Sequence, residues 1–278
     1  MRVLVTGSSG RIGTAIADHL GDDGRYDFTG IDIEPGETTF EAVKADVGQY
    51  DDIRSLFTGQ DAVIHLAIAR GMGRPGDDTV EWNQHLSRTL GEITTVYRAA
   101  IDAGLDTIIF ASSNHAVGMV ELEHAPELYH DVGITVDEHE PHRPDSLYGL
   151  TKCYGEDLGR FVAEMHGIQF YAIRFGAIRS PAYDHPFGDA ERGVDRGDWD
   201  RDSEDYREQV ARMRGLWQSR RDAAHMIDCC LQDDTVAWDH FYGVSGNDRR
   251  WLDDLDHAAD RIGYDPADNG EAWDGPPE

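Results

Sequence analysis

Lysine, cysteine and long apolar runs are scarce in this chain of 278 residues. Only two of its 25 basic residues are lysines, and 54 acidic residues give it a net charge of −29. Such a surface repels phosphate backbones and anionic lipid headgroups, so we expect neither nucleic acid nor a membrane as a partner. No apolar run approaches the roughly 20 residues that a membrane-spanning helix needs.

The cysteines and histidines show no pattern typical of a disulfide framework or a metal site. The three cysteines are Cys153, Cys229 and Cys230, with no C-x-x-C spacing, which favours a reducing compartment. His139 and His142 lie close together among acidic residues, but a surface loop explains them as well. We predict no metal. An apolar strand follows Arg2 without a signal-peptide pattern, so we expect a cytoplasmic protein.

The excess of acid combined with the loss of lysine resembles proteins of salt-loving archaea. Dense carboxylates stay hydrated at high salt, and the salt screens their mutual repulsion. Disorder is the usual alternative for such a charge, but regular apolar strands and six tryptophans argue against it. We therefore predict a folded, halophilic protein.

Apolar runs alternate with amphipathic stretches along the whole chain. This alternation predicts a doubly wound α/β (Rossmann) fold with a parallel sheet. We expect one NAD-binding domain over residues 1–278, with a small C-terminal lobe and substrate-binding segments mainly in 176–278. The polar segment 177–207 has little periodicity and is predicted to be irregular, and the tail 265–278 to be loosely packed. Strands are expected at 3–5, 28–33, 62–67, 107–111, 168–175 and 241–244, and a helix at 12–20.

A glycine turn follows the first strand and opens a helix. Its glycines have the spacing G-x-x-G-x-x-G, at Gly7, Gly10 and Gly13, with Arg11 and Ile12 between the last two. Glycines permit a tight turn and a close approach of the backbone to a pyrophosphate, and the helix N-terminus supplies N–H groups. The turn therefore predicts a dinucleotide site.

Asp32 lies about 20 residues beyond this turn, where a carboxylate can accept hydrogen bonds from the adenosine ribose. It would repel a 2′-phosphate, which favours NAD over NADP. Arg11 argues the other way, because an arginine in the turn can pair with that phosphate. Asp46 and Val47 end the next short strand and are candidates to face the adenine, although a surface-loop carboxylate explains Asp46 equally well.

Tyr148 and Lys152 have the spacing Tyr-x-x-x-Lys, which puts both side chains on one helix face. An ammonium beside a phenol stabilises the phenolate, so Tyr148 becomes a candidate base. Lys152 stands out in a chain that otherwise uses arginine. Ser112 and Ser113 follow a predicted strand, at the edge where α/β folds bind ligands.

Together these motifs resemble an extended short-chain dehydrogenase/reductase, over nearly the whole chain. That resemblance implies a catalytic triad of Ser113, Tyr148 and Lys152, and a fourth-strand segment whose backbone, at Leu66 and Ala67, lines the cofactor.

A closer resemblance is to uronate dehydrogenases and archaeal NAD-dependent glucose-6-phosphate dehydrogenases. It is carried by the runs at 110–115, 143–152 and 243–248. It implies that Asn114 and His115 contact the sugar and that Arg212 holds its anionic end. The chain departs from uronate dehydrogenases at Arg70, at Ala177 and in the longer segment after it, where further arginines are candidates for a phosphate.

We therefore expect an NAD-dependent oxidoreductase that converts the C1 hydroxyl of an anionic aldohexose to the lactone, with glucose 6-phosphate as the favoured substrate. A hexuronate is the first alternative, followed by a neutral aldose. A nucleotide-sugar epimerase or dehydratase would need a larger C-terminal lobe. A non-catalytic NAD-sensing protein tends to lose Tyr or Lys. We also expect a homo-oligomer.

Overall fold

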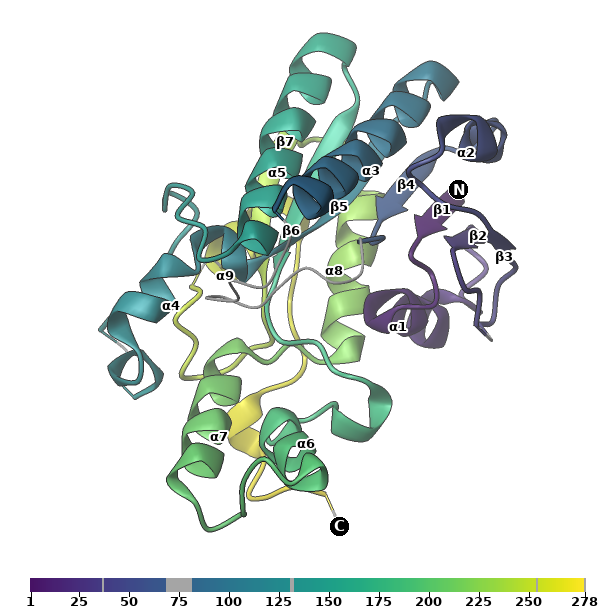
Figure 1. The fold of residues 1–278 in the computed structure, drawn as a ribbon. Helices are drawn as coiled ribbons and strands as arrows, with labels where there is room; N and C mark the ends of the chain where they lie inside the picture. The colour runs from purple at the N-terminus through teal and green to yellow at the C-terminus, as the bar shows by residue number, and fades with distance from the viewer. Residues whose placement is uncertain (37, 69–81, 131–132, 254, 278) are drawn as a thin grey trace.

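The computed structural model describes residues 1–36, 38–68, 82–130, 133–253 and 255–277. In this part of the chain seven parallel strands form one sheet, in the order β3-β2-β1-β4-β5-β6-β7 (Figure 1). The order reverses between β1 and β4, which opens a crevice at the carboxyl ends of these strands. The predicted Rossmann sheet is confirmed. The strands are β1 (Arg2–Thr6), β2 (Asp27–Asp32), β3 (Ala42–Lys44), β4 (Ala62–His65), β5 (Thr107–Ser113), β6 (Gln169–Phe175) and β7 (Trp238–Gly243).

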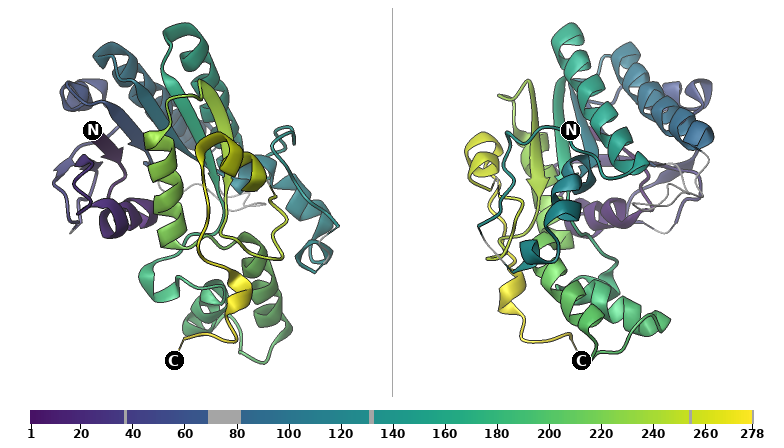
Figure 2. Two further views of the ribbon diagram at one scale, coloured as in Figure 1. Left: turned by 180° about the vertical axis from the view of Figure 1, so that it is seen from behind. Right: turned by 60° about the vertical axis from the view of Figure 1, so that its left-hand side comes forward.

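Helices cover both faces of the sheet, as the right-hand view of Figure 2 shows. One layer packs α1 (Arg11–Leu20), α8 (Arg220–Gln232) and α9 (Leu255–Ile262) against one face. The other layer packs α2 (Tyr50–Phe57), α3 (Trp82–Ala103) and α5 (Leu147–His166) against the opposite face. Successive strand residues alternate between the layers: Val3 and Val5 join the first core, and Leu4 joins the second.

A smaller lobe lies beyond the carboxyl ends of the strands (Figure 1). It contains α6 (Gly188–Arg196), α7 (Glu204–Leu216) and the end of the chain. Its apolar core also takes Val120 and Leu128 from the connection that holds α4 (Met119–His124). The lobe therefore extends beyond the expected segment 176–278. Short 3-10 helices occur at η1 (Asn114–Val117), η2 (Glu127–Tyr129), η3 (Pro181–Tyr183) and η4 (Gly270–Ala272).

The sequence predicts an irregular segment over 177–207, but the structure shows that part of this segment is helical. It contains η3, α6 and the first turn of α7. Helix α6 has few apolar residues, so burial of its own apolar side chains can contribute little to its stability. The helix is stabilised by Trp199, whose indole donates to the Ala190 carbonyl at 2.9 Å and packs over Gly193, where a Cβ atom would lie 2.1 Å from the ring. Tertiary packing therefore stabilises this helix more than its local sequence does.

The tail is also packed more firmly than expected. The amides of Ala267 and Asp268 donate to the buried Asp222 carboxylate at 2.9 and 3.1 Å. The Gly270 amide donates to Asn247 at 2.8 Å. These partners lie far back in the sequence, so the polar composition of the tail does not reveal them. Across the described ranges, no helix is both long and apolar enough to span a bilayer.

Candidate active site

The glycine turn joins β1 to α1. Gly7 has a φ of +70°, and a Cβ atom there would lie 2.8 Å from the Ala67 nitrogen. The turn therefore needs glycine for its conformation and for its approach to the end of β4. Helix α1 begins after Gly10 without a side-chain cap, so its first amides stay open to a ligand. This cradle fits a dinucleotide pyrophosphate.

The third glycine of the motif has a different place. Gly13 is buried within α1 and lines neither of the two pockets described below. A Cβ atom there would lie 2.2 Å from the Ser8 carbonyl oxygen. Gly13 therefore allows the helix to pack tightly on the turn.

The first pocket lies at the carboxyl ends of β1 and β2 and has a volume of about 360 Å³. We call it the β2 pocket. Asp32 lies at its wall, where its carboxylate accepts from the Ser9 amide at 3.1 Å and from the Glu34 amide at 3.0 Å. These bonds fix the carboxylate at the end of the strand. Its remaining lone pairs suit the two hydroxyls of a ribose.

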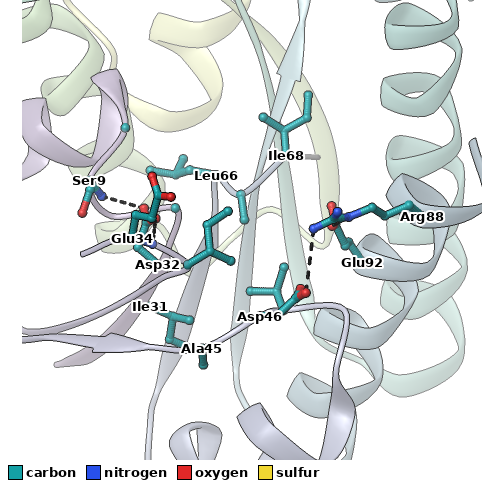
Figure 3. A pocket seen from close by; sticks show the side chains of 15 residues that line it. Ser9, Ile31, Asp32, Glu34, Ala45, Asp46, Leu66, Ile68, Arg88 and Glu92 are labelled. Carbon is teal, nitrogen blue, oxygen red and sulfur yellow. Dashed lines mark hydrogen bonds and ion pairs between the residues drawn. The ribbon is translucent and has the colours of Figure 1, made fainter. Parts of the chain in front are cut away.

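Asp46 faces the β2 pocket across from Asp32 (Figure 3). Its carboxylate accepts from the Gly48 amide at 2.9 Å and lies 3.8 Å from the Arg88 guanidinium. The other predicted cofactor residues on this wall are Gly7, Gly10, Val47, Leu66 and Ala67.

Sequence reasoning missed three charged residues of the β2 pocket. Glu34 lies two residues beyond Asp32. Arg88 and Glu92 lie one turn apart on α3 and form an ion pair at 2.9 Å. The spacing of Arg88 and Glu92 shows a helical pair, but only the fold brings α3 beside β2. Arg11 does not line this pocket and lines the second pocket instead.

The second pocket, of about 350 Å³, lies at the carboxyl ends of β5 and β6. We call it the β5 pocket. Ser113 ends β5, while Tyr148 and Lys152 lie one turn apart at the start of α5. The hydroxyl of Ser146 caps this helix by accepting from the Gly149 amide at 3.1 Å. The structure thus brings the three predicted catalytic residues together on one wall.

Lys152 is held by the sheet. Its ammonium donates to the Ala111 carbonyl at 2.7 Å and lies 5.3 Å from the centre of the Tyr148 ring. Burial lowers the pKa of Lys152 to about 8, while Glu156 and Glu92 act in the opposite direction. Burial also raises the pKa of Tyr148, and the Ser113 hydroxyl opposes that rise. The phenolate therefore depends on positive charge close by.

A buried ion pair lies behind Lys152. Glu156, one turn further along α5, accepts from Arg174 at 3.0 and 2.8 Å and from His142 at 2.8 Å. Burial raises the pKa of Glu156, but Arg174 and His142 bring it well below its usual range. Ser112 also donates to this carboxylate. Ser112 thus supports the helix, and Ser113 faces the pocket. Glu156 follows Lys152 by one helical turn, and this spacing is the signal for Glu156 that sequence reasoning missed.

The predicted sugar-contacting residues occupy the same pocket. His115 bonds Asp145 through Nδ1 at 2.6 Å, and its ring meets the Tyr148 ring edge-on at 5.6 Å. Asn114 is 4% exposed, and its Nδ2 atom has no hydrogen-bond partner within the described structure. A buried donor without a partner is costly, so this atom marks a place for a ligand acceptor.

Arginines form the far wall of the β5 pocket. Arg11, Arg179 and Arg212 line it, and Ile12 lies beside Arg11. Arg192 and Arg196 belong to α6 and lie outside the lining. Arg70, the remaining predicted substrate residue, lies outside the described residues.

The family of the chain follows from residues 3–194, which match the model of the NAD dependent epimerase/dehydratase family. The chain belongs to this family. The predictions of an NAD cofactor and of an oxidoreductase are confirmed.

Two curated relatives from Haloferax volcanii match this member of the family along most of its length. An NAD-dependent glucose-6-phosphate dehydrogenase is 34% identical over 96% of this chain and 93% of its own. An L-arabinose 1-dehydrogenase (NAD(P)(+)) is 31% identical over 96% of this chain and 97% of its own. The structure of a glucuronic acid dehydrogenase from Chromohalobacter salexigens is 27% identical, with a TM-score of 0.72, and covers 98% of this chain and 86% of that one.

These similarities confirm the predicted resemblance to glucose-6-phosphate and uronate dehydrogenases. The predicted halophilic character, cytoplasmic location and homo-oligomer stay predictions.

Proposed function

We propose that this family member oxidises the C1 hydroxyl of an anionic aldohexose to the lactone, and that glucose 6-phosphate is its preferred substrate. One observation carries the proposal. Within the described residues, the β5 pocket is lined by three arginines and a lysine and by no acidic side chain. In a chain with 54 acidic residues, a pocket whose charged side chains are all basic favours an anionic substrate.

The residues of the β5 pocket have distinct tasks in this reaction. Tyr148 takes the proton of the C1 hydroxyl, and Ser113 donates a hydrogen bond to the same oxygen. Lys152 stabilises the phenolate by its charge, and Glu156 opposes the fall in the pKa of Lys152 that burial causes. Asn114 and His115 orient the sugar ring. NAD, when bound with its adenosine in the β2 pocket, supplies the hydride acceptor.

The pairing of His115 with Asp145 supports this arrangement. The carboxylate fixes the ring through Nδ1, so that Nε2 is the nitrogen left for the sugar. Gly118 leaves room for this pair, because a Cβ atom there would lie 2.1 Å from the Asp145 carboxylate.

Steady-state kinetics with NAD test the proposal on matched substrates: glucose 6-phosphate, glucose, arabinose, glucuronate, galacturonate and a UDP-hexose. We expect kcat/KM for glucose 6-phosphate to exceed that for glucose by one to two decades, because charge-assisted hydrogen bonds contribute about 1.5–3 kcal/mol each.

Each other outcome names a different function. A preference for a uronate would identify a hexuronate dehydrogenase, and equal rates with glucose or arabinose a neutral aldose dehydrogenase. Conversion of the UDP-hexose would identify an epimerase. NAD binding without turnover of any sugar would identify an NAD sensor.

A further inference from the structure

The arginines around the β5 pocket are not equally balanced by acids. Arg212 pairs with one carboxylate, that of Glu121, at 2.5 Å from Nε and 3.3 Å from Nη2. The Tyr129 hydroxyl donates to the same carboxylate at 2.9 Å. The charge of Arg212 is therefore matched by Glu121 before any substrate binds.

At the other end of the wall, two arginines share one carboxylate. Arg179 and Arg192 share the carboxylate of Asp189, at 2.6 Å from Arg179 Nε and 2.9 Å from Arg192 Nη2. The guanidinium of Arg11 lies in the field of these two arginines and has no ion pair or hydrogen bond within the described structure. Partial burial, and then the charges of Arg179 and Arg192, lower the pKa of Arg11, while the charge of Asp189 acts in the opposite direction.

Two neighbouring features suit the binding of an anion here. Arg11 is the first residue of α1 and lines the β5 pocket, whereas the open amides of this helix are left to the cofactor pyrophosphate. The unpartnered Asn114 Nδ2 atom lies in the wall of the same pocket and requires an acceptor. A sugar whose ring contacts Asn114 can place its charged end against the arginines.

We propose that Arg11, supported by Arg179, binds the phosphoryl group of the sugar, so that Arg11 and not Arg212 sets the preference for a phosphorylated substrate. This rests on the proposed function. Arg212 then serves mainly through its pair with Glu121, which joins α7 to α4 and closes the side of the pocket.

A phosphoryl anion near Arg11 has two sources, the sugar phosphate and the pyrophosphate of the cofactor. Kinetics separate them. In Arg11→Gln, we expect the ratio of kcat/KM for glucose 6-phosphate to kcat/KM for glucose to fall at least tenfold, with KM for NAD within about threefold of its original value. A rise in KM for NAD with an unchanged ratio would overturn the proposal and assign Arg11 to the cofactor.

Two further variants sharpen the result. Arg54→Gln removes an exposed arginine of α2, whose partner is Asp51, and should leave the ratio unchanged. Arg212→Gln should lower the ratio less than Arg11→Gln does. If Arg212→Gln alone abolished the preference for the phosphorylated sugar, the phosphate site would lie at Arg212 and the proposal would be wrong.

The failure of the proposed function would look different. If the protein oxidised no sugar phosphate, titration calorimetry of the NADH-loaded protein with inorganic phosphate would still test the anion site. Binding that weakens at least tenfold in Arg11→Gln supports the site. Equal binding in both proteins, or none in the original, overturns it.

Discussion

The β2 pocket and the β5 pocket are neighbours and share Leu66 and Ile68, yet their charges are opposite. Asp32, Glu34 and Asp46 line the first, where one arginine, Arg88, stands against four acidic side chains. The second is lined by basic side chains without an acidic one among the described residues. One acidic chain thus offers one site suited to ribose hydroxyls and another suited to an anion.

The difference arises from where each wall comes from. Three of the four carboxylates of the β2 pocket, Asp32, Glu34 and Asp46, lie at or just after the ends of strands, so their positions depend on the sheet. The arginines at 179 and 212 belong to the lobe, and carboxylates of the lobe orient them. Cofactor recognition is therefore built largely into the sheet, whereas Arg179 and Arg212 reach the β5 pocket only through the fold of the lobe. A change in one pocket should leave the other largely intact.

The largest effect is expected from Tyr148→Phe. Removing the phenol removes the proposed base, and general base catalysis is worth about 10²–10⁴-fold. We expect kcat to fall by about three decades, while NADH binding, measured by fluorescence titration, changes by only a few fold.

Tyr154→Phe is the matched control. Tyr154 lies on the same helix, and its hydroxyl bonds Thr94 at 2.8 Å, away from both pockets. It should keep nearly full activity. Substantial turnover by Tyr148→Phe would contradict the assignment of the base.

Asp32→Asn should change the β2 pocket by a smaller amount. Hydrogen bonds to a charged group contribute about 1.5–3 kcal/mol, so the loss of charge should lower kcat/KM for NAD by roughly ten- to a hundredfold. The discrimination against NADP should fall with it, because the 2′-phosphate no longer meets this carboxylate.

Kinetics with both cofactors provide the measurement, and Asp46→Asn provides the comparison. Asp46 lies near Arg88, so its loss should matter less. A native enzyme that prefers NADP would show that Asp32 does not govern the pocket.

Salt should stabilise the acidic fold but weaken the binding of an anionic substrate in the β5 pocket. Of the three predictions, this one has the smallest expected effect on the site. Raising NaCl from about 0.1 M to 1 M shortens the Debye length from about 10 to 3 Å. Screening of the net charge of −29 should raise the melting temperature by several degrees. The same screening should raise KM for glucose 6-phosphate a few fold, with little change in KM for free glucose.

Calorimetry and kinetics over one salt series test both halves. A melting temperature that stays constant would contradict the halophilic prediction. A KM for glucose 6-phosphate that ignores salt would contradict a pocket that binds its substrate by charge.

Local patterns predicted the parts of the site that lie close together in the sequence. The glycine turn was predicted because strand, turn and helix follow one another within a few residues. Tyr148 and Lys152 were predicted because four residues make one helical turn. Asp32 was predicted by its distance from the turn.

Features of the lobe and the tail were beyond such patterns. Helix α6 depends on Trp199 packing over Gly193, and the tail depends on Asp222 and Asn247. Each partner is chosen by packing and not by periodicity, so the sequence alone suggested irregular chain.

The sequence by itself therefore determined the Rossmann sheet, and it predicted the dinucleotide turn and the Tyr148–Lys152 pair, because each rests on spacing along a strand or a helix. Only the tertiary structure decided which arginines are already paired with a carboxylate and which are left to pair with a ligand. Arg212 pairs with Glu121 across 91 residues of sequence, while Arg11 lies in the electrostatic field of other arginines. The charge of a pocket depends on distances between atoms from separate elements, and those distances exist only once the lobe has closed over the sheet.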